Sequence, residues 1–305
     1  MKMKHAQFQI SFSWLFAIIV GAFILFLAIY ASTKLINIGQ TEQDVKAGTE
    51  INILLNPLET SFESGKVISF SMPVESRIYS KCDNRGVFGT QKLSVSQISF
   101  NEWTETDLDV SSYNKYIFAD IPSEGKNFYV FSKPFEFPFK VADLIYLIPS
   151  EKKYCFTDAP ENIEEELEKL NIKNIFMENC SGSEIKVCFE GVCDIRVNYE
   201  GNYVKKGNDV NYFYSDALMY AIIFSDSNLY ECQVKRLMQR TGQLALLYND
   251  KAKFIENKGC DSNLGLQIFR GEVENFEDSS DLEFIAISAE DIQDKNNANW
   301  ECKLW

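Results

Sequence analysis

Histidine is nearly absent from this 305-residue chain, and its single copy, His5, lies within the first few residues. This scarcity excludes a histidine base and a histidine-ligated metal from the main body of the protein. Phosphate-cradling glycine loops and the G-x-S-x-G element of serine hydrolases are also missing, so nucleotide use and acyl hydrolysis have no support. We therefore expect a protein that is not an enzyme and that uses no cofactor and no metal.

Negative charge is absent from the first 40 positions, where the charged side chains are Lys2, Lys4 and Lys34. From residue 41 onward the chain holds 44 acidic and 27 basic residues, a net charge of −17. An acidic body of this kind repels a phosphate backbone, so we expect no nucleic-acid partner. The hydrophobic share of 46% and the charged share of 24% are ordinary for a globular protein, which excludes global disorder.

Charge is also missing from the long apolar run between Phe12 and Ala31, FSWLFAIIVGAFILFLAIYA. At about 1.5 Å per helical residue, this run crosses the roughly 30 Å hydrocarbon core of a bilayer. A core helix would show a polar face, and none is present. A cleavable signal has a shorter apolar stretch and then a small-x-small site, which the residues up to Lys34 do not offer. We predict an uncleaved transmembrane helix over residues 12–33, with the lipid bilayer as its partner.

The flanks of this run predict its orientation. Lys2, Lys4 and the amino terminus precede it, whereas Lys34 alone follows it closely. The positive-inside rule then places the N-terminus in the cytoplasm and the C-terminal domain outside a membrane that the chain crosses once. Trp14 and Tyr30 lie near the two ends, as in an aromatic belt.

The leader before the apolar run has a basic stretch that ends in a small residue, Ala6, followed by Gln7. It resembles the class III signal of archaeal type IV pilin-like proteins, in which a peptidase cuts after such a small residue. The resemblance is confined to this N-terminal segment and implies cleavage between Ala6 and Gln7. A short polar leader before any membrane anchor has the same appearance. The aromatic-, Asn- and Lys-rich remainder is similar to uncharacterised archaeal surface proteins.

Cysteine is confined to the part of the chain that follows the apolar run. The eight cysteines are Cys82, Cys155, Cys180, Cys188, Cys193, Cys232, Cys260 and Cys302. Their even number agrees with an extracytoplasmic location, where disulfides persist. Two close C-x2-C pairs, which a zinc ribbon needs, and a redox C-x-x-C motif are both missing, so structural disulfides are favoured.

One disulfide follows from a predicted turn. β-formers flank Glu190-Gly191, which indicates a tight β-hairpin with a two-residue loop. Cys188 and Cys193 would then face each other as a non-hydrogen-bonded pair about 4.5 Å apart at Cα, at the short end of disulfide geometry. Cys180 competes with either of them as a partner.

The other pairs are less constrained by the sequence. Cys260 and Cys302 flank the last helical region, and a bridge between them would close it, although Cys232 to Cys302 is almost equally favoured. By elimination, Cys82 pairs most simply with Cys155, which would link two β-type segments.

Patterning predicts a single transmembrane helix followed by an α+β ectodomain, with a β-rich membrane-proximal part and a helical C-terminal part that share a core. The expected boundaries are a cytoplasmic leader over 1–11, the transmembrane helix over 12–33, a juxtamembrane helix over 34–59, the β-rich part over 60–205 and the helical part over 206–305. The expected ectodomain helices are residues 160–170 capped by Asp158, 217–224, 228–256 capped by Asn228, and a final helix capped by Ser280.

Two surfaces could serve partners. Phe135, Phe137 and Phe139 lie in a proline-containing stretch, which indicates a sheet edge or an extended loop. Packing of these rings onto the sheet is favoured over an exposed patch. The apolar stripe of the helix over 228–256 could pair subunits as a coiled coil, but packing within its own domain is simpler.

The leading interpretation is a membrane-anchored surface protein with a structural or adhesive role. The resemblance of its leader to class III signals implies a pilin-like version of this protein. The alternative is an extracytoplasmic binding or receptor subunit of a membrane complex, which predicts a concave pocket or an exposed aromatic patch near Phe135, Phe137 and Phe139. A homo-oligomer or a membrane-complex partner is compatible with both. Asn179, in Asn179-Cys180-Ser181, is a glycosylation acceptor that a disulfide at Cys180 would hinder sterically.

Overall fold

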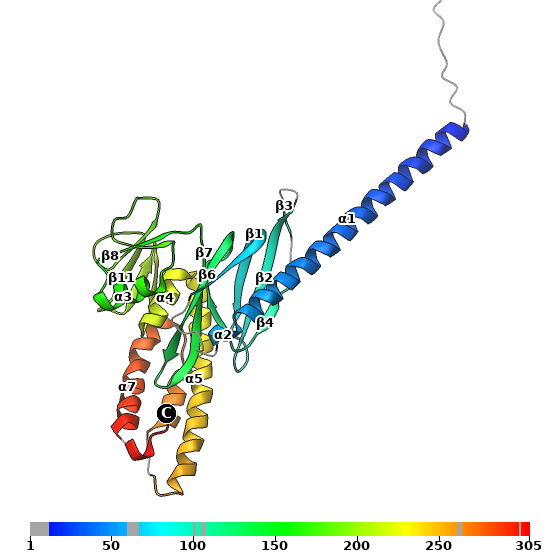
Figure 1. Ribbon diagram of the computed structural model, residues 1–305. Helices are drawn as coiled ribbons and strands as arrows, with labels where there is room; N and C mark the ends of the chain where they lie inside the picture. The colour runs from blue at the N-terminus through cyan, green and yellow to red at the C-terminus, as the bar shows by residue number, and fades with distance from the viewer. Residues whose placement is uncertain (1–11, 60–66, 100–101, 105–107, 261–263, 299) are drawn as a thin grey trace, which may run out of the picture.

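The computed structural model describes residues 12–59, 67–99, 102–104, 108–260, 264–298 and 300–305, with the backbone alone at 35–41, 59, 99 and 300. One long helix leads into a body of two β-sheets and a set of C-terminal helices (Figure 1). The body is a mixed α/β structure, which confirms the coarse fold class predicted from the sequence.

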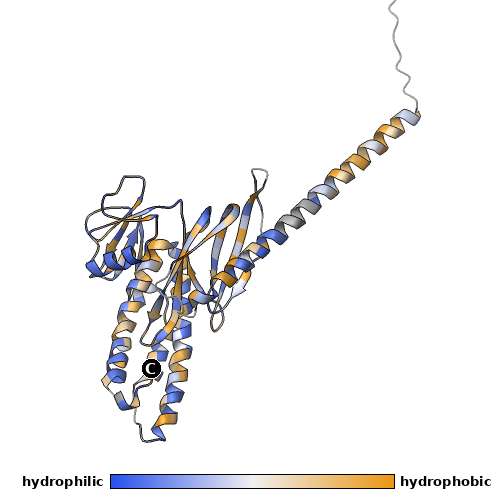
Figure 2. Ribbon diagram, in the orientation of Figure 1, coloured by the Kyte–Doolittle hydropathy of each residue, from blue (hydrophilic) through white to orange (hydrophobic). Residues whose placement is uncertain are grey.

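Helix α1 (Phe12–Leu54) is continuous over 43 residues, about 65 Å, and joins the predicted apolar and juxtamembrane helices into one rod. Its first half projects away from the body (Figure 1), and many of its residues are hydrophobic (Figure 2). Residues Phe12–Lys34 are long and apolar enough to cross a membrane, and none of the side chains in this part packs inside the protein.

The first sheet contains seven of the described strands in the order β3-β2-β1-β6-β7-β5, with β4 beside β2. Only β5 and β7 pair in parallel among them. The strands are β1 (Ile68–Asp83), β2 (Thr90–Ser99), β3 (Glu102–Trp103), β4 (Val110–Ser112), β5 (Tyr116–Phe118), β6 (Ser123–Glu136) and β7 (Lys140–Pro149).

The second sheet contains six of the described strands in the order β13-β12-β11-β10-β8-β9. Neighbours from β9 to β11 run parallel, and the last two pairs are antiparallel. The strands are β8 (Tyr154–Thr157), β9 (Ile175–Met177), β10 (Ile185–Cys188), β11 (Ile195–Asn198), β12 (Tyr203–Lys206) and β13 (Asp209–Tyr212).

Helices cover both faces of the first sheet. One face packs on the end of α1 and on α2 (Asn56–Glu59), and the other packs on α4 (Asp216–Phe224) and α5 (Ser227–Glu256). The remaining helices are α3 (Glu161–Leu170), α6 (Leu266–Glu274) and α7 (Leu282–Ala298), with 3-10 turns η1 (Ser279–Asp281) and η2 (Trp300–Cys302). One hydrophobic cluster joins β6, β7 and the second sheet to α4–α7, so the β-rich and helical parts share a core.

The aromatic run at the end of β6 is buried. The rings of Phe135, Phe137 and Phe139 are at most 1% exposed, and Phe139 lies 5.3 Å from the Trp305 ring between centroids. Pro134 is tolerated here because β1 pairs with β6 no further than Val130, which leaves that side of β6 as a local edge. The exposed aromatic patch that the receptor interpretation predicted is therefore wrong.

The predicted hairpin at Glu190-Gly191 is also wrong. β10 and β11 are joined by a longer loop and run parallel, with Val187 opposite Ile195. The Asp194 carboxylate accepts a hydrogen bond from Lys186 N–H at 2.9 Å, so a side chain of the connecting loop contacts the backbone of β10.

The helix caps differ from those predicted. Pro160, not Asp158, is the N-cap of α3, because Asp158 adopts a left-handed conformation with φ 55°. Asp226, not Asn228, caps α5, and its carboxylate accepts a hydrogen bond from Asn228 N–H at 2.9 Å. Each of these two caps lies two residues from the predicted one, although the helix itself forms.

Candidate functional site at the junction of helix α1 and the first sheet

The second half of α1 turns one stripe toward the sheet. Asp44, Gly48, Ile51 and Leu55 follow the four-and-three spacing of a helix face, and all are buried. Ile51 and Leu55 join a hydrophobic cluster with Leu93 and residues of β1, β6 and β7. We call this contact between the second half of α1 and the first sheet the junction. The first half of α1, which is apolar and exposed, lies outside it.

Gly48 allows α1 to approach the sheet closely. A Cβ atom at this position would lie 3.4 Å from Val110 Cγ2, 3.8 Å from Val95 Cγ2 and 3.9 Å from the Leu93 carbonyl oxygen. An alanine would just fit, whereas any larger side chain would overlap with β2 and β4. The glycine, which weakens a helix in isolation, is therefore explained by packing.

Asp44 is the polar member of the stripe and is only 2% exposed. Neither carboxylate oxygen has a hydrogen-bond partner within the described part of the chain. Burial raises the pKa of Asp44, and the nearby Thr104 side chain offsets part of this rise. The Thr104 hydroxyl is itself engaged, since it accepts the Gln97 N–H at 2.9 Å and donates to Ser96 Oγ at 3.3 Å. The junction thus contains a carboxylate that burial disfavours in its charged form.

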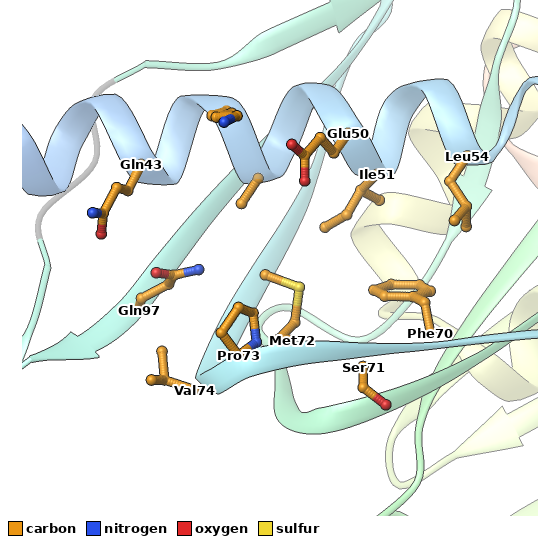
Figure 3. Close-up of a pocket in the computed structure, with 12 residues that line it drawn as sticks. Gln43, Glu50, Ile51, Leu54, Phe70, Ser71, Met72, Pro73, Val74 and Gln97 are labelled. Carbon is orange, nitrogen blue, oxygen red and sulfur yellow. The ribbon is translucent and has the colours of Figure 1, made fainter.

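A groove of about 600 Å³ lies beside this stripe, between α1 and β1 (Figure 3). Ile51 and Leu54 of the helix face Phe70 and Met72 of the strand across it (Figure 3). β1 pairs with β2 only from Ser76 onward, so the β1 residues that line the groove, from Phe70 to Val74, have no described partner in β2. Its walls are mainly apolar, and it offers a surface for packing rather than for chemistry.

The described residues contain no group of three or more His, Cys, Asp or Glu side chains that could hold a metal ion. Ser112 and Lys115 match the Ser-x-x-Lys spacing that some serine hydrolases use, but Lys115 is occupied by another contact. Lys115 is buried and its ammonium group donates to Asn56 Oδ1 at 2.6 Å.

All eight predicted disulfide cysteines are bridged. Cys188–Cys193 and Cys260–Cys302 are pairs that the sequence favoured, the first with Cα atoms 6.1 Å apart instead of the expected 4.5 Å. The other two bridges are Cys82–Cys232 and Cys155–Cys180.

The predicted Cys82–Cys155 bridge is wrong. Cys82 ends β1 in the first sheet and reaches α5, whereas Cys155 lies on β8 in the second sheet. β9 pairs beside β8, so the loop after β9 brings Cys180 to Cys155. The long separation of 150 residues in Cys82–Cys232 left no local signal for that pair.

Asn179, the predicted glycosylation acceptor, is exposed and has a left-handed φ of 50°. Its neighbour Cys180 is bridged, which is the condition under which we expected steric hindrance. The predicted cleavage junction at Ala6 and Gln7 lies outside the described residues.

The sequence analysis missed the roles of Asp44 and Gly48. A signal was available in the sequence, because Asp44 and Gly48 share the helical spacing of Ile51 and Leu55. A carboxylate and a glycine on an otherwise apolar helix face indicate positions with a special role. Comparison of the chain with protein-family models, curated proteins and solved structures finds no match.

Proposed function

We propose that this protein is a non-enzymatic, membrane-anchored structural or adhesive protein whose disulfide-bonded domain lies outside the cell membrane. The observation that carries the proposal is the division of α1 into an exposed, uncharged half and a half that is docked on the sheet. Exposed side chains on every face of an apolar helix are costly in water and favourable in a bilayer.

Two further features support the outward orientation. Four disulfides are typical of an oxidising compartment, and the cytoplasmic side is favoured for the lysine-bearing N-terminus. Between Lys34 and Asp44 the helix rises by about 15 Å, which would hold the domain just beyond the headgroup region.

The pilin-like version adds lateral packing of α1 between copies. It rests on the resemblance of the leader to class III signals and on the straight apolar rod that projects from the body (Figure 1). Because the apolar run over 12–31 carries no charge, neighbouring copies would pack there through van der Waals contacts in the bilayer or in a filament core.

Membrane extraction tests the anchor. Full-length protein should stay in the membrane pellet in alkaline carbonate and in high salt, and should be released by detergent. Leu25→Arg places a charge in the apolar run and should shift the protein toward the soluble fraction. Leu247→Arg, at an exposed position of α5, is the matched control and should leave the distribution unchanged. Release of the unmodified protein by carbonate would contradict the anchor.

Protease added to the outside of intact cells or spheroplasts tests the orientation, and should degrade the domain while sparing the apolar run. Sequencing of the mature N-terminus tests the pilin-like version, which requires Gln7 as the first residue. An intact leader would remove the pilin-like version and leave the anchor standing.

A further inference from the structure

A polar pocket of about 450 Å³ lies at one edge of the second sheet, far along the chain from the α1 junction. It is lined by residues that directly follow the carboxyl ends of β8 and β10, and by the C-terminal half of β11 and the turn after it. β8, β10 and β11 are parallel neighbours, so their carboxyl ends meet at the same edge.

The strand order reverses at this point of the sheet. The chain leaves β8 through α3 and returns as β9 on one side, and then crosses to become β10 on the other side. In open parallel sheets such a reversal leaves a crevice outside the carboxyl ends, which is the usual place for a small ligand. The pocket lies in this crevice.

The pocket walls combine charges of both signs with aromatic rings. Asp158, Glu190 and Glu200, named here the acidic trio, are exposed at its wall. Arg196 is exposed beside them, and its guanidinium has no hydrogen-bond or ion-pair partner among the described residues. The acidic trio and Arg196 together carry a net charge of −2, so an anionic ligand such as a nucleotide is disfavoured.

Phe189 and Tyr199 provide an aromatic corner in the same pocket, with ring centroids 6.2 Å apart. Tyr199 is held in place because its hydroxyl donates to Asp216 Oδ1 at 2.9 Å. Aromatic faces beside carboxylates are a setting in which ammonium and guanidinium groups bind. A free guanidinium next to them is a fitting partner for a carboxylate.

The loop that carries Phe189 and Glu190 is closed by the Cys188–Cys193 disulfide. This bridge spans five residues and restricts the wall that bears one member of the acidic trio. A restrained wall loses less conformational entropy when a ligand binds.

We propose that this pocket binds a free basic α-amino acid, lysine or arginine. The ligand carries two positive groups, which are opposite in charge to the acidic trio, and one negative group, which is opposite in charge to Arg196. Its carboxylate pairs with Arg196, and its ammonium or guanidinium groups meet the acidic trio and the aromatic corner. This site lies outside the proposed anchoring function and does not depend on it.

Calorimetric titration of the full-length protein in detergent micelles tests the proposal with three probes. L-lysine carries both kinds of charge, cadaverine is the same diamine without the carboxylate, and L-norleucine lacks the side-chain ammonium group. L-lysine should bind at least about tenfold more tightly than either, equivalent to ~1.4 kcal/mol or more. L-arginine should bind in the same range as L-lysine.

Four variants connect the binding to these residues. Arg196→Gln should reduce L-lysine to the affinity of cadaverine, and Glu190→Gln or Glu200→Gln should weaken L-lysine and cadaverine together. Glu290→Gln is the matched control, since Glu290 lines a different polar pocket beside Tyr214, and it should change nothing.

The proposal is overturned if neither lysine nor arginine shows saturable binding. It is overturned equally if the three probes bind with the same affinity, or if Arg196→Gln leaves the preference for L-lysine over cadaverine unchanged. Because the titration is carried out in detergent, a negative result leaves the membrane-extraction experiment unaffected, and the reverse also holds.

Discussion

Among the single residues of the junction, Asp44 has the least favourable environment. Its buried carboxylate has no hydrogen-bond partner among the described residues, and burial raises its pKa above the usual value of about 3.8. At a pH between the pKa of the unfolded chain and the raised pKa of the folded state, the folded protein keeps a proton on this carboxyl that the unfolded chain has released. The free energy of unfolding therefore falls as the pH rises through the interval between the two pKa values.

Asp44→Ala should accordingly raise the melting temperature at neutral pH by a few degrees, because it removes a buried charge. The advantage over the unmodified protein should disappear near pH 3, where the carboxyl is protonated in both states. Glu50→Ala, at an exposed position of the same helix, removes the same charge and should show no such pH dependence. Thermal unfolding from pH 3 to 8 checks this, and a lower melting temperature of Asp44→Ala at pH 7 would contradict it.

At the level of secondary-structure elements, the docking of α1 depends on the close approach at Gly48. Gly48→Leu should force the helix away from Val110 and Val95 and cost ~1–3 kcal/mol, as overpacked sites do. Gly48→Ala should be neutral or slightly stabilising, because its Cβ just fits and alanine favours a helix by about 1 kcal/mol over glycine.

Limited proteolysis and thermal unfolding of the detergent-solubilised protein check the Gly48 prediction. Gly48→Leu should expose the helix from Asp44 to Leu55 to cleavage and lower the melting temperature. Thr49→Leu adds a leucine at the next, exposed position and should match the unmodified protein. Equal protection of both leucine variants would show that the close approach at Gly48 does not hold α1 on the sheet.

Elements with a strong local pattern could be predicted from the sequence. The uninterrupted apolar run over 217–224 predicted a buried helix, and every residue of α4 from Ala217 to Phe224 is buried. The apolar stripe of α5 packs within its own domain, as its spacing indicated. These predictions succeeded because a helix period is a local property of the chain.

Features that depend on distant segments could not be predicted in the same way. The reversal of strand order beside β8, which creates the pocket at that edge, follows from how α3 and β9 return to the sheet. The parallel pairing of β10 with β11, where a hairpin was expected, depends on the assembled sheet and not on the local turn signal at Glu190-Gly191. The partner of Cys82 lies 150 residues away on α5, where only the assembled core brings the two together.

For the whole molecule, the four disulfides connect elements that are separate in the chain. Cys82–Cys232 fastens the first sheet to α5, and Cys260–Cys302 ties the end of the chain back to the region after α5. In the chain-entropy model the stabilisation grows with the closed loop. The separation of 150 residues in Cys82–Cys232 corresponds to about 5 kcal/mol, and the separation of 5 in Cys188–Cys193 to about 2 kcal/mol.

We expect native full-length protein to contain no more than one or two free thiols when it is alkylated under denaturing conditions. Reduction of all bridges should lower the melting temperature by well over ten degrees, since each bridge contributes about 2–5 kcal/mol and each kcal/mol corresponds to roughly 2–4 °C in a domain of this size. The Cys82→Ala/Cys232→Ala pair should cost more than Cys188→Ala/Cys193→Ala, in the order of their loop lengths. Eight free thiols in the native protein would overturn both the disulfide pairs and the outward orientation of the domain.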